Sequence, residues 1–243
     1  MGLCRIVQRV AAAAIGAAFA GIVGAACALA QAPSQSAPGE PISPPQWTGP
    51  WVGAAALGGW SNSAISELAA QSGGLFHRFD TLGIGGGGEV SFGYDWRPQR
   101  NKLVAGLVGE IGFVHDPGGH VLRTTTNLIG SAQLRLGIAA SPAMLLYGQS
   151  GIAFDNQSVA IDFGGPTMQQ NRVTPGITLG AGAEYVIIAP PHPPLGATTS
   201  IFAEFQHVWW ASDAIDMPAA VPGLDFQWQR QSSIVKAGIR VRY

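Results

Sequence analysis

Residues 234–243 read Ile-Val-Lys-Ala-Gly-Ile-Arg-Val-Arg-Tyr, and this stretch decides the fold. One parity of the stretch holds only apolar or aromatic side chains: Val235, Ala237, Ile239, Val241 and Tyr243. The other parity holds the charges and a glycine: Lys236, Gly238, Arg240 and Arg242. Because successive side chains of a strand point to opposite faces, the segment has one apolar and one charged wall. Three cations do not suit the core of a soluble sandwich, so the pattern predicts a membrane strand with its charged wall in a barrel lumen.

The start of the chain predicts export from the cytoplasm. Residues 1–9 carry Arg5 and Arg9 without an acid, residues 10–26 are apolar, and the Ala-Leu-Ala of residues 28–30 fits a cleavage site. We therefore predict a secretory signal peptide over residues 1–30. A retained signal anchor is the alternative, which the low hydrophobicity of an Ala- and Gly-rich run disfavours.

Cysteine usage follows from that assignment. Cys4 and Cys27 both lie in the segment that we expect to be removed. Lipidation at Cys27 is a second alternative, but the residues before it lack the large aliphatic side chain of a lipobox. The mature chain would then contain no cysteine, which excludes disulfides and thiolate metal sites.

Composition narrows the class of protein. The chain is 11% charged, with 34 glycines and 17 prolines, and its mean hydropathy is +0.22. Without residues 1–30 it keeps eleven basic and fourteen acidic residues, a net charge of −3. No basic patch points to nucleic acid, and no apolar run after the signal is long enough for a transmembrane helix.

The rest of the chain divides into a linker and a barrel. Residues 31–46 are rich in Pro and Ser and predict a periplasmic linker. Eight alternating segments follow as candidate strands: residues 51–61, 88–96, 102–114, 128–139, 144–154, 173–187, 200–210 and 234–243. Long connections are predicted at residues 62–87, 115–127, 155–172 and 211–225, with shorter ones between the remaining strands except for a Pro-rich connection at 188–199. Short periplasmic turns opposite long outer loops are typical of an outer-membrane barrel.

The charged residues of these strands share the lumen parity. They are Glu89, Asp95, Lys102, Glu110, Arg135, Glu184, Glu204, Lys236, Arg240 and Arg242. An eight-stranded barrel is just wide enough for side chains to fill, and buried charges are tolerated when they are paired. We predict a structural lumen charge network of Glu89, Glu110, Arg135, Glu184, Glu204, Lys236 and Arg240. A narrow ion path through the same residues is the alternative.

Aromatic residues lie near the predicted strand ends, where amphipathic rings favour the membrane–water boundary. They are Trp51, Trp60, Tyr94, Trp96, Tyr185, Trp209, Trp210, Trp228 and Tyr243. Tyr243 is also the final residue, and bacterial outer-membrane barrels commonly end in an aromatic residue, so we assign it as the carboxyl-terminal barrel signal.

Motifs for other chemistry are weak. The four glycines at residues 85–88 lack the Lys-Ser/Thr of a phosphate loop and precede a strand. His115, Asp116 and His120 could meet at a metal, but scattered loop histidines seldom do. His77, His192 and His207 have no convergent partner in the sequence. No Gly-x-Ser-x-Gly elbow is present, and we expect neither catalysis nor a cofactor, with an active site at the outer rim as the alternative.

Four stretches resemble the small eight-stranded outer-membrane barrels of alphaproteobacteria, often called outer-membrane immunogenic or porin-like surface proteins. They are Trp-Thr-Gly-Pro-Trp-Val-Gly (47–53), the strand 130–137, Gly-Ala-Gly-Ala-Glu-Tyr (180–185) and Ala-Glu-Phe (203–205). The resemblance spans residues 47–243. This chain departs from the family at Gln133, where an arginine is usual, and at Tyr243, where Phe is more common. The resemblance implies a surface or envelope-stabilising role without established enzymatic activity.

The sequence as a whole predicts an all-β, eight-stranded, antiparallel up-and-down barrel over residues 47–243 in the outer membrane of a Gram-negative bacterium. Its expected partners are outer-membrane lipid, the barrel-assembly machinery and an unknown surface ligand of the long loops. Its expected role is structural or adhesive. A porin-like channel for ions or small solutes and a soluble periplasmic sandwich are the alternatives.

Overall fold

The computed structural model describes residues 47–69, 75–98, 102–115, 122–161, 168–188, 197–211, 213–215 and 224–243. The predicted signal peptide and linker lie outside these residues. The strands are β1 (Gly49–Ala69), β2 (Leu75–Trp96), β3 (Leu103–His115), β4 (Leu122–Ala139), β5 (Met144–Ile161), β6 (Met168–Ile188), β7 (Thr198–Trp210), β8 (Asp213–Ile215) and β9 (Leu224–Arg242).

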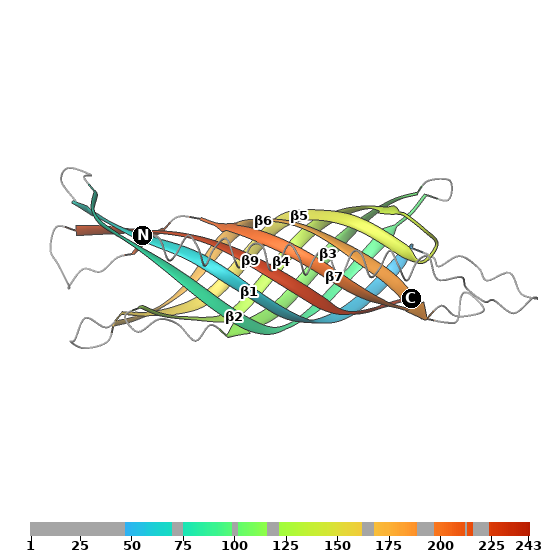
Figure 1. Ribbon diagram of the computed structural model, residues 1–243, viewed down its shortest axis with the longest axis horizontal. Coiled ribbons are helices and arrows are strands. Elements are labelled where there is room, and N and C mark those ends of the chain that lie inside the picture. The colour runs from blue at the N-terminus through green and yellow to red at the C-terminus, as the bar shows by residue number, and fades with distance from the viewer. Residues whose placement is uncertain are drawn as a thin grey trace, which may run out of the picture.

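These strands form a closed barrel (Figure 1). Each strand from β1 to β7 pairs antiparallel with the next, and β7 pairs with β9. The pairing of β1 with β9, from Trp51 opposite Arg242 onward, closes the wall. β8 is a three-residue strand that pairs with β9 on the same side as β7, beyond the end of the β7–β9 ladder. The predicted eight-stranded antiparallel barrel is therefore confirmed.

In the described part of the chain, no helix is long and apolar enough to cross a membrane.

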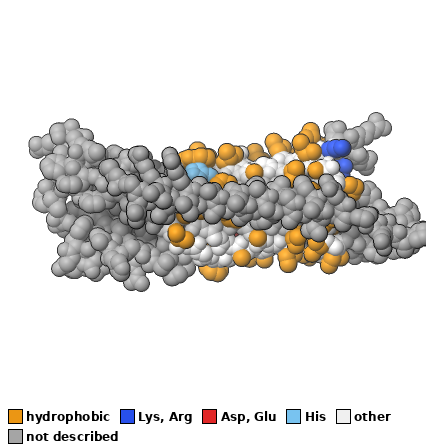
Figure 2. Space-filling model, in the orientation of Figure 1, with side chains coloured by type: hydrophobic (Ala, Val, Ile, Leu, Met, Phe, Trp, Pro, Cys, Tyr) orange, Lys and Arg blue, Asp and Glu red, His pale blue; other side chains and the backbone are white. Residues whose placement is uncertain are grey.

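The outer wall is apolar because the strand parities fall as predicted. Leu134 is 64% exposed, Leu179 55% and Ile239 51%, while Arg135, Glu184 and Arg240 on the opposite parity are buried. Hydrophobic side chains are spread over the visible part of the outer wall in Figure 2. Exposed apolar area of this extent is normal only where the surface meets a partner or lipid.

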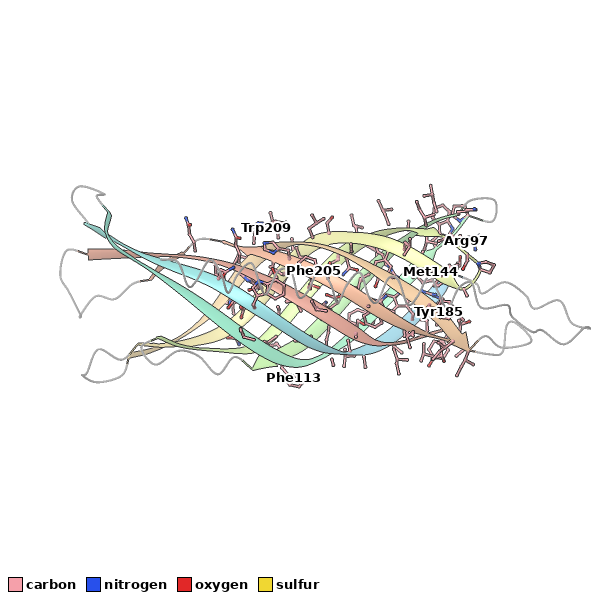
Figure 3. All side chains as sticks on the ribbon, in the orientation of Figure 1. Arg97, Phe113, Met144, Tyr185, Phe205 and Trp209 are labelled. Carbon is pink, nitrogen blue, oxygen red and sulfur yellow. The ribbon has the colours of Figure 1, made fainter. Side chains whose placement is uncertain are left out.

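The two ends of the barrel differ. One end, which we call the turn end, holds the short β2–β3 and β4–β5 connections and the last residue, Tyr243. Figure 3 shows Arg97, Met144 and Tyr185 near this end, with Trp209 farther toward the other. We call that other end the rim end.

At the rim end, three predicted long connections, 62–87, 115–127 and 155–172, are shorter than predicted. β1 continues to Ala69 and β2 begins at Leu75, so most of the predicted connection 62–87 is strand. β4, β5, β6 and β9 also extend into predicted connections. Clean alternation is needed only where one face of a strand meets lipid. Beyond the lipid, backbone pairing continues the strands without that sequence signal.

Two predicted boundary aromatics point inward instead. Trp51 is 1% exposed and Trp210 is 7% exposed. Their positions share the parity of the lumen, and the parity of residues 51–61 was ambiguous in the sequence because both faces there hold Gly and Ala. The side chain of Trp228 lies outside the described residues. Trp60, Tyr94, Trp96, Tyr185, Trp209 and Tyr243 have the outward parity.

The first strand starts at a glycine for a steric reason. Gly49 has φ of +136°, a conformation that residues with a Cβ rarely adopt. A Cβ there would also collide with the Tyr243 carbonyl oxygen. Beside it, the Thr48 hydroxyl accepts a hydrogen bond of 3.0 Å from the Arg97 backbone N–H. The opening segment thus joins the first and last strands to the end of β2.

Candidate functional site: the charged barrel interior

The barrel interior concentrates the charges of the chain. All seven residues of the predicted lumen network point inward and are at most 7% exposed: Glu89, Glu110, Arg135, Glu184, Glu204, Lys236 and Arg240. Asp95 and Arg242 join them, at 0% and 3% exposed. They come from β2, β3, β4, β6, β7 and β9, because alternation on every strand places the charged parity inside.

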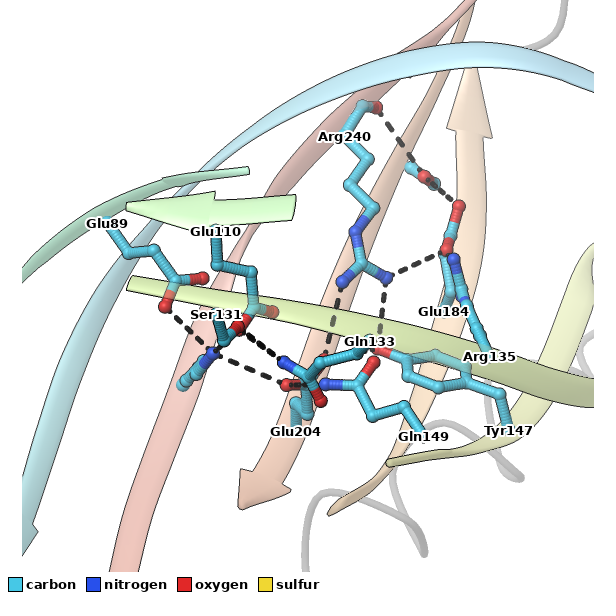
Figure 4. Close-up of polar contacts among 12 residues, drawn as sticks. Glu89, Glu110, Ser131, Gln133, Arg135, Tyr147, Gln149, Glu184, Glu204 and Arg240 are labelled. Atoms are coloured by element: carbon cyan, nitrogen blue, oxygen red, sulfur yellow. Dashed lines mark hydrogen bonds and ion pairs between the residues drawn. The ribbon is translucent and has the colours of Figure 1, made fainter. Parts of the chain in front are cut away.

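Lys236 is the centre of the first layer. Its Nζ lies 2.7 Å from Glu89 Oε2, 2.8 Å from Glu110 Oε2 and 3.5 Å from Glu204 Oε1 (Figure 4). One ammonium group on the last strand therefore joins carboxylates from three other strands.

The second layer contains the arginines. Glu184 accepts hydrogen bonds from Arg135 at 2.6 Å and from Arg240 at 3.0 Å. Asp95 lies 2.6 Å from Arg242 and 3.2 Å from Arg135. Arg240 also lies 3.3 Å from Glu204, so that this carboxylate links the two layers.

Aromatic rings stack on the guanidinium groups. The Arg240 guanidinium carbon lies 4.6 Å from the centroid of the Trp51 ring and 3.8 Å from that of Phe202. The Arg135 guanidinium carbon lies 3.7 Å from the Tyr147 ring centroid. Such cation–π contacts are strongest when desolvated, at about 2 kcal/mol or more. The guanidinium groups of Arg135 and Arg240 are therefore both in contact with aromatic rings inside the barrel.

Glycine provides the space for one of these rings. A Cβ at Gly93 would lie 2.5 Å from the Trp51 ring and 2.5 Å from the Leu107 carbonyl oxygen. The indole of Trp51 can therefore lie across the lumen only because β2 carries no side chain at residue 93.

Neutral polar groups complete the network. Glu110 accepts hydrogen bonds from Ser131 at 2.7 Å and from Gln133 at 2.6 Å. The Gln149 amide and the Tyr147 hydroxyl both donate to Glu204. The sequence signals only the lumen parity of these residues, because neutral side chains do not reveal a pairing partner. Gln133 therefore binds an acid of the network even though the arginine usual in the resembling family is missing.

Apolar clusters lie on both sides of the charged layers. Toward the turn end the cluster consists of Trp47, Val104, Ala139, Leu145, Tyr147 and Val186. Toward the rim end it consists of Leu57, Ala153, Val208, Trp210 and Ile234. Buried apolar side chains therefore lie on both sides of the two charged layers.

A second ion pair lies beyond the rim-side apolar cluster. Arg230 donates a hydrogen bond to the Asp155 carboxylate. Both residues are buried, Arg230 at 7% and Asp155 at 1% exposed. The Arg230 guanidinium carbon lies 4.4 Å from the Trp210 ring centroid. This pair does not follow from the sequence, because residue 155 lies in a predicted connection and residue 230 precedes the predicted last strand at 234–243.

One predicted lumen residue lies elsewhere. Lys102 is exposed and precedes β3 at the turn end, so the prediction that it faces the lumen is wrong. Lys102 is the first residue of the predicted strand 102–114, so no preceding strand residue fixes the direction of its side chain, which explains the error. The two charged layers then contain five acids and four bases.

The remaining candidates form neither a phosphate loop nor a metal site among the described residues. Residues 85–88 form part of β2 and pair with β1, as a strand and not a loop. His207 Nδ1 lies 2.9 Å from Ser233 Oγ on the outward parity. No group of three or more His, Cys, Asp or Glu in the described part could hold a metal ion. Asp116, His120 and His192 lie outside the described residues, as do the side chains of His77 and His115.

Comparison with known proteins places the chain among outer-membrane proteins. No protein-family model matches it. The 31 kDa outer-membrane immunogenic proteins of Brucella melitensis and Brucella suis are each 28% identical over 195 residues, covering 72% of this chain and 79% of the relatives. The predicted resemblance and the predicted outer-membrane location are confirmed by this similarity.

Solved structures with a similar fold include two small barrels. Neisserial surface protein A (NspA) is 14% identical with a TM-score of 0.44, over 81% of this chain and 98% of that one. OprG from Pseudomonas aeruginosa is 12% identical with a TM-score of 0.48, over 81% of this chain and 96% of that one.

Proposed function

We propose that this outer-membrane β-barrel surface protein is a sealed, non-conducting barrel that stabilises the envelope and carries its rim end to the cell surface. The paired charges in its lumen are structural and close the lumen to ions. The observation that carries the proposal is the Arg240 guanidinium, which is buried between the Trp51 and Phe202 rings while bound to Glu184.

The energetics of the lumen support a structural role. Removing one partner of a buried ion pair costs about 3–5 kcal/mol, because the other charge stays buried without compensation. An ion that crossed this lumen would have to separate several such pairs and also pass the two apolar clusters. The pairs join strands distant in sequence, such as Arg242 to Asp95, so they resist deformation of the barrel.

Planar-bilayer recording distinguishes this proposal from the porin-like alternative. We expect no persistent single-channel openings from the wild-type protein, whose insertion is verified by flotation with vesicles. Arg135→Ala is the comparison variant, because it removes a guanidinium that joins Asp95 and Glu184. Persistent wild-type openings that change in conductance in Arg135→Ala would contradict the sealed barrel and establish a pore.

A deletion strain tests the envelope role. Loss of the protein should increase the sensitivity of the producing bacterium to detergents, and wild-type protein should restore resistance. A variant with a destabilised lumen, such as Lys236→Met, should restore less at equal expression. Unchanged sensitivity in the deletion strain would argue against a structural role.

The Brucella relatives are named as immunogenic outer-membrane proteins. A barrel whose strands extend past the lipid would present such a surface, which supports the assignment of the rim end to the exterior.

A further inference from the structure

The apolar outer wall changes in character on one side of the barrel. On β2 to β6, exposed large hydrophobic side chains continue toward the rim end as far as Ile84, Phe113, Leu128, Phe154 and Val173. On β7, β9 and β1 the outward side chains nearest the rim end include a group that we call the rim patch: His207, Trp209, Gln231, Ser233 and Trp60. Figure 2 shows a histidine among hydrophobic side chains on the outer wall. Hydrogen-bonding groups therefore interrupt the apolar wall here.

The strand register brings the rim patch together. Ser233 on β9 lies opposite His207 on β7 and opposite Trp60 on β1. Gln231, two residues closer to the rim end, lies opposite Trp209. Because all five residues have the outward parity, they form two adjacent rows on the face that meets lipid.

The side chains of the rim patch are packed against one another. His207 Nδ1 lies 2.9 Å from Ser233 Oγ, and the imidazole meets the Trp209 ring edge to face with centroids 4.4 Å apart. The centroid of a Trp60 ring lies 6.2 Å from that of Phe205. These two rings extend over β9, because β9 separates their strands. Ser233 is only 6% exposed although it points outward.

The polar groups of the patch lie where the wall meets the membrane boundary. Tryptophan rings such as Trp60 and Trp209 favour that boundary. A polar group next to hydrocarbon costs free energy unless it is hydrogen-bonded. Because His207 Nδ1 is paired with Ser233, its Nε2 is the nitrogen left for a group outside the wall, and the Gln231 side chain is exposed.

The chemistry of the patch fits a sugar. Imidazole and amide groups exchange hydrogen bonds with hydroxyl and amide groups, and indole rings pack on the C–H face of a sugar ring. Every Lys and Arg side chain that the structure describes lies in the lumen or at the turn end, as Arg97 and Lys102 do. The described groups of the patch therefore suit a sugar better than a phosphate.

A row of alanines lies next to the patch on the side of the turn end. Ala237 on β9 lies opposite Ala203 on β7 and Ala56 on β1, and Ala183 continues the row on β6. Their short side chains leave room against the wall for acyl chains. A headgroup bound at the patch would place its acyl chains over this row, inside the bilayer.

We propose that the rim patch binds the acylated sugar headgroup of an outer-leaflet glycolipid. The sugar packs on the rings of Trp60 and Trp209 and exchanges hydrogen bonds with His207 and Gln231. This inference names a lipid partner for the envelope role in the proposed function, and it rests on the assignment of the rim end to the exterior.

Native mass spectrometry of the folded full-length protein in detergent tests the site with three lipids. They are lipid A, which has an acylated glucosamine headgroup, lipid A without its phosphates, and phosphatidylethanolamine. We expect both forms of lipid A to bind, and phosphatidylethanolamine to bind about tenfold more weakly because it lacks the hydrogen-bonding groups of a sugar.

Two substitutions in the patch have a matched control elsewhere on the wall. His207→Leu and Ser233→Val should each weaken lipid A binding about two- to tenfold, the factor that one hydrogen bond supplies. Ser150→Val should bind as wild type does, because Ser150 is an exposed outward serine on β5 between Leu134 and Leu179.

Urea unfolding in vesicles gives a second readout whose sign differs. In phosphatidylcholine vesicles His207→Leu should not lower the midpoint, because leucine is the better side chain against lipid. Adding lipid A should raise the wild-type midpoint, since a ligand of the folded state stabilises it, and should raise that of His207→Leu less.

Four results would overturn the proposal. They are equal binding of lipid A and phosphatidylethanolamine, loss of binding when the phosphates are removed, equal binding of lipid A by wild type and both patch variants, or a wild-type dimer that His207→Leu dissociates, which would identify a second copy as the occupant. The comparison of lipids on wild type needs no variant, and heat-modifiable gel migration verifies that each variant is folded. The bilayer recordings concern the lumen, so a conducting barrel and a wall that binds no glycolipid are separate results.

Discussion

Lys236 forms ion pairs with three carboxylates, whereas Arg240 forms ion pairs with two. Both side chains are 1% exposed. The desolvation of each charge is offset only by its partners. A buried ion network of this kind is therefore sensitive to the loss of any one member, and most sensitive at the residue shared by the most partners.

Lys236→Met tests that dependence, because methionine keeps much of the stem and removes the charge. Glu89 and Glu110 would then lie close together without a cation. We expect a loss of about 3–5 kcal/mol of unfolding free energy, measured by urea unfolding of the vesicle-inserted barrel through tryptophan fluorescence.

Lys102→Met is the matched control for that substitution. Lys102 is exposed at the turn end, so its loss should change stability by no more than about 0.5 kcal/mol. Adding Glu89→Gln and Glu110→Gln to Lys236→Met should recover part of the lost stability. Equal effects of the two lysine substitutions would show that the lumen network does not hold the barrel.

Gly93→Ala tests the packing of Trp51 at the same scale. The new methyl group would enter the space of the indole and of a neighbouring backbone carbonyl, and overpacking of this kind costs about 1–3 kcal/mol. Gly58→Ala is the control, since the nearest atom to its Cβ is 4.0 Å away. A lower urea midpoint for Gly93→Ala alone is expected, and equal midpoints would contradict the steric argument.

The sequence predicts a strand best where lipid touches it. In β9, Lys236, Arg240 and Ile239 lie on the walls that alternation predicts. The partners across the lumen, such as Glu89 for Lys236, could not be predicted, because register and shear decide which inward side chains meet. Asp155 and Arg230 were missed for a related reason, since beyond the lipid the backbone ladder continues without alternation.

Substitutions along β6 test the position of the lipid at the scale of one strand. Leu179 and Val173 have the same outward parity, with 55% and 63% exposed, but Val173 lies closer to the rim end. We expect Leu179→Arg to cost about 2–4 kcal/mol and Val173→Arg about 0–1 kcal/mol, because the cost of a charge falls from the bilayer midplane to its interface. A larger loss of unfolding free energy for Val173→Arg than for Leu179→Arg would contradict this position of the lipid, because the bilayer midplane would then lie closer to Val173.

The whole molecule divides along its axis into a membrane part and a rim. On β3, outward apolar residues run from Leu103 to Phe113, a length that spans about 25–30 Å in a tilted strand and matches the apolar band of such barrels. The charged layers and both apolar clusters lie within the same part of the molecule. The rim-end parts of β1, β2, β4, β5, β6 and β9 extend past it as paired strands.

Shortening the rim tests whether the membrane part is stable without it. Ser63 lies opposite Thr81 in the β1–β2 ladder, so residues 64–80 can be replaced by Asn-Gly, which forms a two-residue hairpin turn. The shortened chain should still run faster unboiled than boiled, with a urea midpoint close to that of wild type, because every lumen contact described above lies outside residues 64–80. A shortened chain that fails to fold would show that closure begins at the rim, and the lumen charges alone would then not account for the stability of the barrel.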